Sequence, residues 1–166
     1  FIESKRHSIG NSGFEVNYLP DIAFDFQKYI IEKAVNKGRI AIFADTGLGK
    51  TLIQLSIAKN IINHTNKKVL IMTPLAVAFQ FILEAEKLGI DDIEYSKDGR
   101  HTKKIVICNY ERLHYFKESD FVGVILDESS ILKNFDGKIK SQVTAFVKKI
   151  PYRFLAFDNS EEDHLI

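Results

Sequence analysis

The chain has 166 residues, a mass of 19.0 kDa, 45% apolar residues and a formal net charge of +1 at neutral pH. This length supports one hydrophobic core and one domain, and neither half of the chain has the composition of a polybasic arm for nucleic acid. The single cysteine, Cys108, supports no disulfide, and the five histidines lack the spacing of a zinc site. No apolar stretch is long enough for a membrane span and no signal peptide is recognised, so we expect a cytoplasmic protein with no membrane partner.

The sequence alternates between short apolar runs, which predict buried strands, and longer segments with apolar residues at helical spacing. Residues 1–19 mix glycine, serine, asparagine and charge, so we expect an irregular lead-in. Gly38, Gly89 and Pro151 end helices, and Pro74 ends a strand. The predicted helices cover residues 22–35, 49–63, 75–88 and 137–149, with a short helical segment that ends near residue 116. The predicted strands cover residues 40–43, 67–72, 93–95, 105–108, 121–126 and 153–157.

This order of elements predicts a three-layer α/β domain with a mainly parallel sheet over residues 20–157. Residues 158–166 form an acidic tail whose sequence fits neither a strand nor a helix. In an open parallel sheet, ligands bind beyond the carboxyl ends of the strands. Functional residues are therefore expected directly after the predicted strands.

The strand at 40–43 is followed by Ala44-Asp45-Thr46-Gly47-Leu48-Gly49-Lys50-Thr51, and this run opens a helix. A strand, a glycine-rich loop and a helix in that order are typical of a P-loop, although Ala44 stands where the usual pattern has glycine. The alternative is a glycine-rich turn with an incidental lysine. The flanking strand and helix favour the P-loop, which makes a P-loop nucleotide-binding domain the expected class.

The P-loop residues have distinct expected roles. Gly47 and Gly49 let the backbone turn tightly, so that its N–H groups and the positive end of the helix hold a polyphosphate. Lys50 is expected to reach the β- and γ-phosphates of ATP, and the Thr51 hydroxyl to ligate Mg²⁺. The residues predicted to bind the nucleotide are Thr46, Gly47, Leu48, Gly49, Lys50 and Thr51.

A second chemical signal is Asp127-Glu128, which follows the apolar run 121–126. At the carboxyl end of a strand, both acids face the same crevice as the P-loop. Asp127 is expected in the Mg²⁺ shell, and Glu128 is expected to orient and deprotonate an attacking water. The alternative is an acidic helix N-terminus, but the P-loop upstream favours catalysis. The predicted catalytic residues are Lys50, Asp127 and Glu128.

Gln27 lies in the predicted helix ahead of the P-loop. A glutamine amide both donates and accepts, so it can pair with the N6 amine and N7 of adenine. Spacing alone favours the alternative, a glutamine on the surface.

Five motifs in the same order resemble those of superfamily 2 DEAD/DEAH-like helicases. The run 121–134 with Tyr152-Arg153 is especially similar to phage-encoded members related to Swi/Snf-type DNA translocases. The match extends over roughly residues 20–155, which is more specific than any single motif. The motifs are Phe26-Gln27, Ala44 to Thr51, Met72 to Leu75, Asn109 to Glu111 and Leu126 to Ser130.

The resemblance implies a RecA-like lobe that binds ATP and Mg²⁺, acts with a second such lobe, and moves along nucleic acid. It implies that Gln27 reads adenine and that the DEAD-type motif is formed by Asp127 and Glu128. DNA is the expected partner, with RNA left open. Ordinary strand-end turn chemistry is the alternative for the loops expected to touch the nucleic-acid backbone. Those loop residues are Thr73, Pro74, Asn109 and Tyr110.

Two features depart from the family pattern. Phe154-Leu155-Ala156 continues into 157–160 without the Ser/Thr-Ala-Thr motif of the family. The length accommodates one lobe, so we expect an ATP hydrolase lobe whose partner lobe comes from sequence outside the chain or from another chain. A non-catalytic module that binds DNA or protein and is stabilised by nucleotide is the alternative. A kinase or GTPase is disfavoured, since neither an arginine-bearing lid nor an Asn-Lys-x-Asp motif is recognised.

Overall fold

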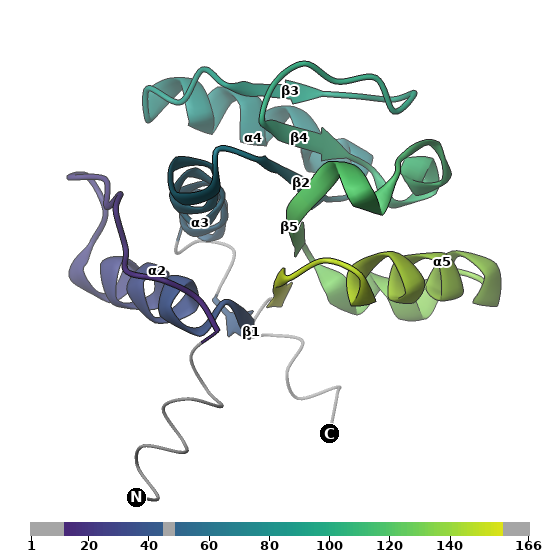
Figure 1. Cartoon of the computed structure of the whole chain (residues 1–166), viewed down its shortest axis with the longest axis horizontal. Coiled ribbons are helices and arrows are strands. Elements are labelled where there is room, and N and C mark those ends of the chain that lie inside the picture. Colours follow the sequence, from purple (N-terminus) through teal and green to yellow (C-terminus); the bar gives the residue numbers. More distant parts are fainter. Residues whose placement is uncertain (1–11, 45–48, 158–166) are drawn as a thin grey trace, which may run out of the picture.

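The computed structural model describes residues 12–44 and 49–157. Its centre is a six-stranded sheet in the order β1-β6-β5-β2-β4-β3, and every neighbouring pair is parallel. Figure 1 shows the sheet running between helices on both sides. The strands are β1 (Arg39–Phe43), β2 (Lys68–Met72), β3 (Ile93–Tyr95), β4 (Ile105–Cys108), β5 (Phe121–Leu126) and β6 (Tyr152–Phe157).

The α-helices form the outer layers of the fold. They are α2 (Asp25–Lys37), α3 (Lys50–Thr65), α4 (Leu75–Lys87) and α5 (Gly137–Lys148). Short 3₁₀ helices are η2 (Tyr110–Tyr115), η3 (Glu118–Asp120) and η4 (Ser129–Asn134). The expected three-layer α/β fold is confirmed, and the sheet is parallel throughout the described residues.

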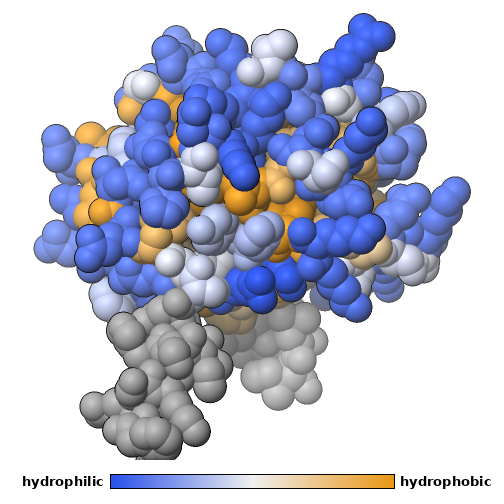
Figure 2. Space-filling model, viewed as in Figure 1, coloured by the Kyte–Doolittle hydropathy of each residue, from blue (hydrophilic) through white to orange (hydrophobic). Residues whose placement is uncertain are grey.

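Alternation along the strands divides the core into two parts. Val69 and Ile71 of β2 face a cluster built with α2, α3 and α4, whereas Leu70 and Met72 face a cluster built with η2 and α5. Successive side chains of a strand point to opposite faces, so a strand buried on both faces is apolar at every position. In the view of Figure 2 most of the surface is hydrophilic, and apolar residues show mainly between the hydrophilic ones.

Helix α2 begins at Asp25, later than the expected residue 22. Residues 21–23 form a turn in which the Ala23 N–H donates to the Pro20 carbonyl at 3.0 Å. Apolar periodicity extends across this turn, so the sequence predicted a helix that begins too early. Gly38 ends the helix in the left-handed region at φ 75°, as glycine does at helix ends.

The described part of the lead-in, residues 12–19, contains no helix or strand but is bound to the domain. Asn60 of α3, which is fully buried, accepts from the backbone N–H groups of Asn17 (2.7 Å) and Tyr18 (3.0 Å). Its amide nitrogen donates to the Tyr18 and Ser56 carbonyls. Residues 1–11 and the predicted acidic tail 158–166 lie outside the described residues. No described helix is both long and apolar enough to cross a membrane.

Candidate nucleotide-binding site

The register of the central strands brings three loops together. Met72 of β2 pairs with Cys108 of β4 on one side and with Leu126 of β5 on the other. The Asp127 N–H donates to the Met72 carbonyl at 2.7 Å, which continues the ladder by one residue. The residues that follow these three strands therefore lie side by side at the carboxyl edge of the sheet. They are Thr73, Asn109 and Asp127.

The P-loop connects β1 to α3, and its described residues are Ala44, Gly49, Lys50 and Thr51. Asp45, Thr46, Gly47 and Leu48 lie outside the described residues, so their phosphate contacts stay predictions.

Lys50 and the two acids come together as the sequence predicts. The Lys50 ammonium lies 3.1 Å from Asp127 Oδ1 and 3.8 Å from Glu128 Oε1. The side chains of Lys50 and Asp127 are only 6% and 2% exposed, and a buried charge is tolerated only when it is paired. Among the described residues, Lys50 Nζ makes these ion pairs but no hydrogen bond. It therefore keeps donor capacity for an anionic ligand.

Asp127 is held through both of its carboxylate oxygens. Gln54 Nε2 donates to Oδ1 at 2.9 Å, and the Thr73 hydroxyl donates to Oδ2 at 2.7 Å. With the lysine on Oδ1, these contacts fix the orientation of the carboxylate. Sequence reasoning missed Gln54. The available signal was a polar residue one turn after Lys50, on a helix whose neighbouring positions are apolar and buried.

Glu128 follows with a left-handed backbone at φ 50° and ψ 49°, which is costly for a residue with a side chain. Its side chain is 31% exposed and lies beside a hollow of about 230 Å³. The hollow is lined by residues 49–52 at the start of α3, by Asp127 and Glu128 after β5, and by Val77, Gln80 and Glu84 of α4. A carboxylate at this position can reach a water in the hollow.

These residues fit a magnesium-bound polyphosphate. Mg²⁺ is commonly held by one or two carboxylates together with substrate phosphates, and Thr51 and Asp127 offer the hydroxyl and carboxylate oxygens for it. Lys50 offers a buried cationic donor of the kind that suits phosphates. Gly49 has φ 77°, so the loop reaches the helix in a conformation that other residues rarely adopt.

Gln27 packs directly against the P-loop glycine. It is 4% exposed, so the alternative of a surface glutamine is wrong. A Cβ added to Gly49 would lie 2.2 Å from Gln27 Nε2, and Gln27 Oε1 accepts from the Phe24 N–H at 2.8 Å. The structure thus brings Gln27 to the nucleotide site, and adenine reading by its amide stays a prediction.

We expect Gly49→Ala to weaken ATP binding about tenfold, because a left-handed backbone costs an L residue about 1–2 kcal/mol and the new methyl group displaces Gln27. Equilibrium titration with a fluorescent ATP analogue measures the effect. Gly137→Ala is the matched control, since a Cβ there meets no atom within 4 Å. Equal affinities for the two variants would contradict the close packing of Gln27 on the loop.

The four residues predicted to touch nucleic acid are placed differently from one another. Pro74 is partly exposed, whereas Thr73, Asn109 and Tyr110 are 0%, 3% and 1% exposed. Thr73 and Tyr110 both bind Asp127, Tyr110 through its hydroxyl to the Asp127 carbonyl at 2.6 Å. Asn109 accepts from the Tyr95 hydroxyl at 2.7 Å and donates to Glu111 at 2.9 Å. Contact between these loops and nucleic acid stays a prediction.

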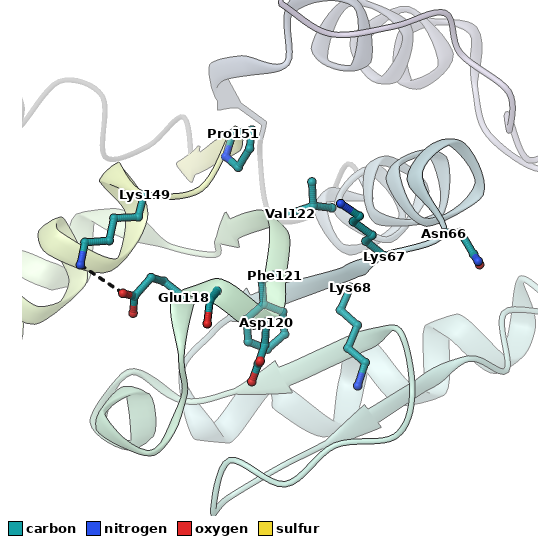
Figure 3. A pocket seen from close by; sticks show the side chains of 10 residues that line it. Asn66, Lys67, Lys68, Glu118, Asp120, Phe121, Val122, Lys149 and Pro151 are labelled. Carbon is teal, nitrogen blue, oxygen red and sulfur yellow. Dashed lines mark hydrogen bonds and ion pairs between the residues drawn. The ribbon is translucent and has the colours of Figure 1, made fainter.

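A larger hollow, of about 630 Å³, lies at the other end of the sheet, beside the amino ends of β2 and β5. Apart from Lys67, its charged side chains are paired with protein groups. Figure 3 shows Lys149 turned toward Glu118, with the two charged atoms 3.1 Å apart. Lys68 lies 2.7 Å from His101 Nδ1, and His101 Nε2 lies 3.4 Å from Asp120.

The parallel sheet and the P-loop elements at its carboxyl edge define a RecA-like P-loop NTPase domain. The family model for "DEAD/DEAH box helicase" matches residues 24–157, and the chain belongs to this family. No curated protein matches the sequence.

Solved structures share the fold at low sequence identity. The UvsW helicase of bacteriophage T4 superposes with a TM-score of 0.72 at 18% identity, over 97% of this chain and 61% of that one. A second structure of T4 UvsW gives a TM-score of 0.72 at 17% identity, over 96% of this chain and 34% of that one. The Sulfolobus solfataricus SWI2/SNF2 ATPase core in complex with dsDNA gives 0.63 at 18% identity, over 88% of this chain and 34% of that one. The chain thus spans less than two thirds of each of these structures.

Proposed function

We propose that the chain is the ATP-binding first lobe of a nucleic-acid-dependent ATPase, a DNA helicase or translocase. The observation that carries this proposal is the buried Lys50–Asp127 pair at the carboxyl edge of the sheet, with Glu128 beside it and a hollow in front. Lys50 binds the β- and γ-phosphates, Thr51 and Asp127 hold Mg²⁺, and Gln27 reads adenine. When bound, Mg²⁺ neutralises charge on the phosphates.

Glu128 is the proposed general base. It lies at the edge of the hollow with its carboxylate partly exposed, where it can accept a proton from a water that attacks the γ-phosphate. Lys50 and the positive end of α3 stabilise the negative charge of the transferred group. The P-loop backbone supplies further donors.

A second lobe completes the proposed enzyme. Phosphoryl transfer in such ATPases needs cations on the far side of the phosphate, often arginines. The described lining of the hollow carries three acids, Asp127, Glu128 and Glu84, and Lys50 is its one described cation. The structural neighbours are longer than this chain, which supports a second lobe outside it. DNA is the proposed partner because one neighbour is an ATPase core in complex with dsDNA.

The experiment that tests the proposal measures ATP binding and steady-state hydrolysis by the 166-residue chain, with and without duplex and single-stranded DNA. We expect Mg²⁺-dependent ATP binding and almost no turnover in any condition. Binding without turnover supports an incomplete site. DNA-stimulated turnover would contradict the need for a second lobe, and absence of Mg²⁺-dependent ATP binding would contradict the proposal as a whole, including its non-catalytic alternative.

A further inference from the structure

Two loops that lie far apart in the sequence bind the same residue of the nucleotide site. After β2, the Thr73 hydroxyl donates to the Asp127 carboxylate at 2.7 Å. After β4, the Tyr110 hydroxyl donates to the main-chain carbonyl of Asp127 at 2.6 Å. These two contacts therefore hold the side chain and the backbone of Asp127 separately.

Because both hydroxyls are buried, breaking either contact with Asp127 is unfavourable. Thr73 is 0% and Tyr110 is 1% exposed, so neither hydroxyl has access to bulk water when its contact with Asp127 breaks. A phenolic hydroxyl is a hydrogen-bond donor, and in Tyr110 it donates to the Asp127 carbonyl.

The contact from Tyr110 also bears on Glu128. The Asp127 carbonyl belongs to the peptide group that precedes Glu128, and Glu128 has a left-handed backbone at φ 50°. A residue with a Cβ holds this conformation only when its surroundings impose it. By fixing the orientation of that peptide, Tyr110 helps Glu128 to keep its carboxylate at the hollow.

We propose that Thr73 and Tyr110 are positioning residues for Asp127 and Glu128, and that they connect the loops after β2 and β4 to the Mg²⁺ site. The inference rests on the proposed function and adds a route of regulation to it. Each loop is one hydrogen bond away from Asp127, so a nucleic acid that shifts either loop alters the metal ligand directly.

Burial also argues against the simpler role of these two side chains as nucleic-acid contacts. A phosphate oxygen can accept from the Thr73 or Tyr110 hydroxyl only if that hydroxyl leaves Asp127. Either change would leave an oxygen of buried Asp127 without its donor, which is unfavourable. Contact with nucleic acid therefore falls to other groups of the same loops, such as the partly exposed Pro74.

The test compares Thr73→Val, Thr73→Ser and Tyr110→Phe with the unmodified chain. Valine matches the shape of threonine without the donor, serine keeps the donor, and phenylalanine removes only the phenolic hydroxyl. Binding of a fluorescent ATP analogue is titrated against Mg²⁺, and binding of a short fluorescein-labelled DNA duplex is measured by anisotropy. Circular dichroism verifies that each variant is folded.

We expect Thr73→Val and Tyr110→Phe to raise the Mg²⁺ concentration at half-saturation about tenfold, as outer partners of a metal ligand do. Thr73→Ser should restore it, and DNA affinity should change little in all three variants. Unchanged Mg²⁺ dependence in both Val and Phe variants, with weakened DNA binding, would overturn the inference while leaving the nucleotide site intact. If Thr73→Val fails to fold, the Mg²⁺ dependence of Tyr110→Phe alone tests the inference. An unmodified chain without Mg²⁺-dependent nucleotide binding would overturn the proposed function and this inference together.

Discussion

Lys50→Ala should weaken nucleotide binding about 100-fold or more. The ammonium contributes charge-assisted hydrogen bonds to phosphates, worth about 1.5–3 kcal/mol, which corresponds to a loss of about 10- to 100-fold in affinity. The variant also leaves Asp127 buried beside the phosphates with only neutral donors, Gln54 and Thr73. Repulsion between this carboxylate and the nucleotide adds to the loss, so we expect the upper end of that range or beyond. Isothermal titration with Mg²⁺ and ATP measures it.

Stability has to be measured alongside binding for this variant. Removing one partner of a buried ion pair costs about 3–5 kcal/mol, so thermal unfolding followed by circular dichroism is part of the experiment. Lys50→Met keeps the aliphatic stem and serves if the alanine variant unfolds. Lys59→Ala, farther along α3 and outside the hollow, is the control. A folded Lys50 variant with the affinity of the unmodified chain would remove the basis for the phosphate site.

The sequence predicted the parts of this site that lie in contiguous motifs. Asp127 follows β5 directly, Lys50 follows β1 after the P-loop, and parallel strands end at one edge of the sheet. That general rule is enough to predict that the two side chains meet, and they lie 3.1 Å apart. The three-layer fold follows from alternating strand and helix patterns in the same way.

The hydrogen bonds to Asp127 could be predicted only from the order of the strands in the sheet. The apolar pattern of the sequence does not determine that order. Because β2 lies between β4 and β5, Thr73 and Tyr110 both reach Asp127. Alternation of strands and helices is compatible with several orders of strands, so turn chemistry and nucleic-acid contact were the expectations for these loops. Gln54 was missed for a related reason, since its partner Asp127 follows a strand that is distant in sequence.

Glu128→Gln is expected to keep nucleotide binding and to reduce hydrolysis about 100- to 10,000-fold in a protein that carries both lobes. The amide has the shape of the carboxylate but cannot take a proton from water. Binding persists because the Lys50–Asp127 pair, at 3.1 Å, does not depend on Glu128, which lies 3.8 Å from the lysine. Single-turnover hydrolysis and equilibrium binding of ATP separate the two quantities.

The comparison with Glu84→Gln makes this result specific. Glu84 lines the same hollow from α4, so its substitution removes a negative charge from the same space without removing the proposed base. Glutamine at position 128 has the same backbone requirements as glutamate there, so the left-handed conformation is not an added variable. A loss of hydrolysis in Glu128→Gln alone identifies proton acceptance as the missing step. Equal losses in both variants would mean that the charge of the hollow matters and that the base lies elsewhere.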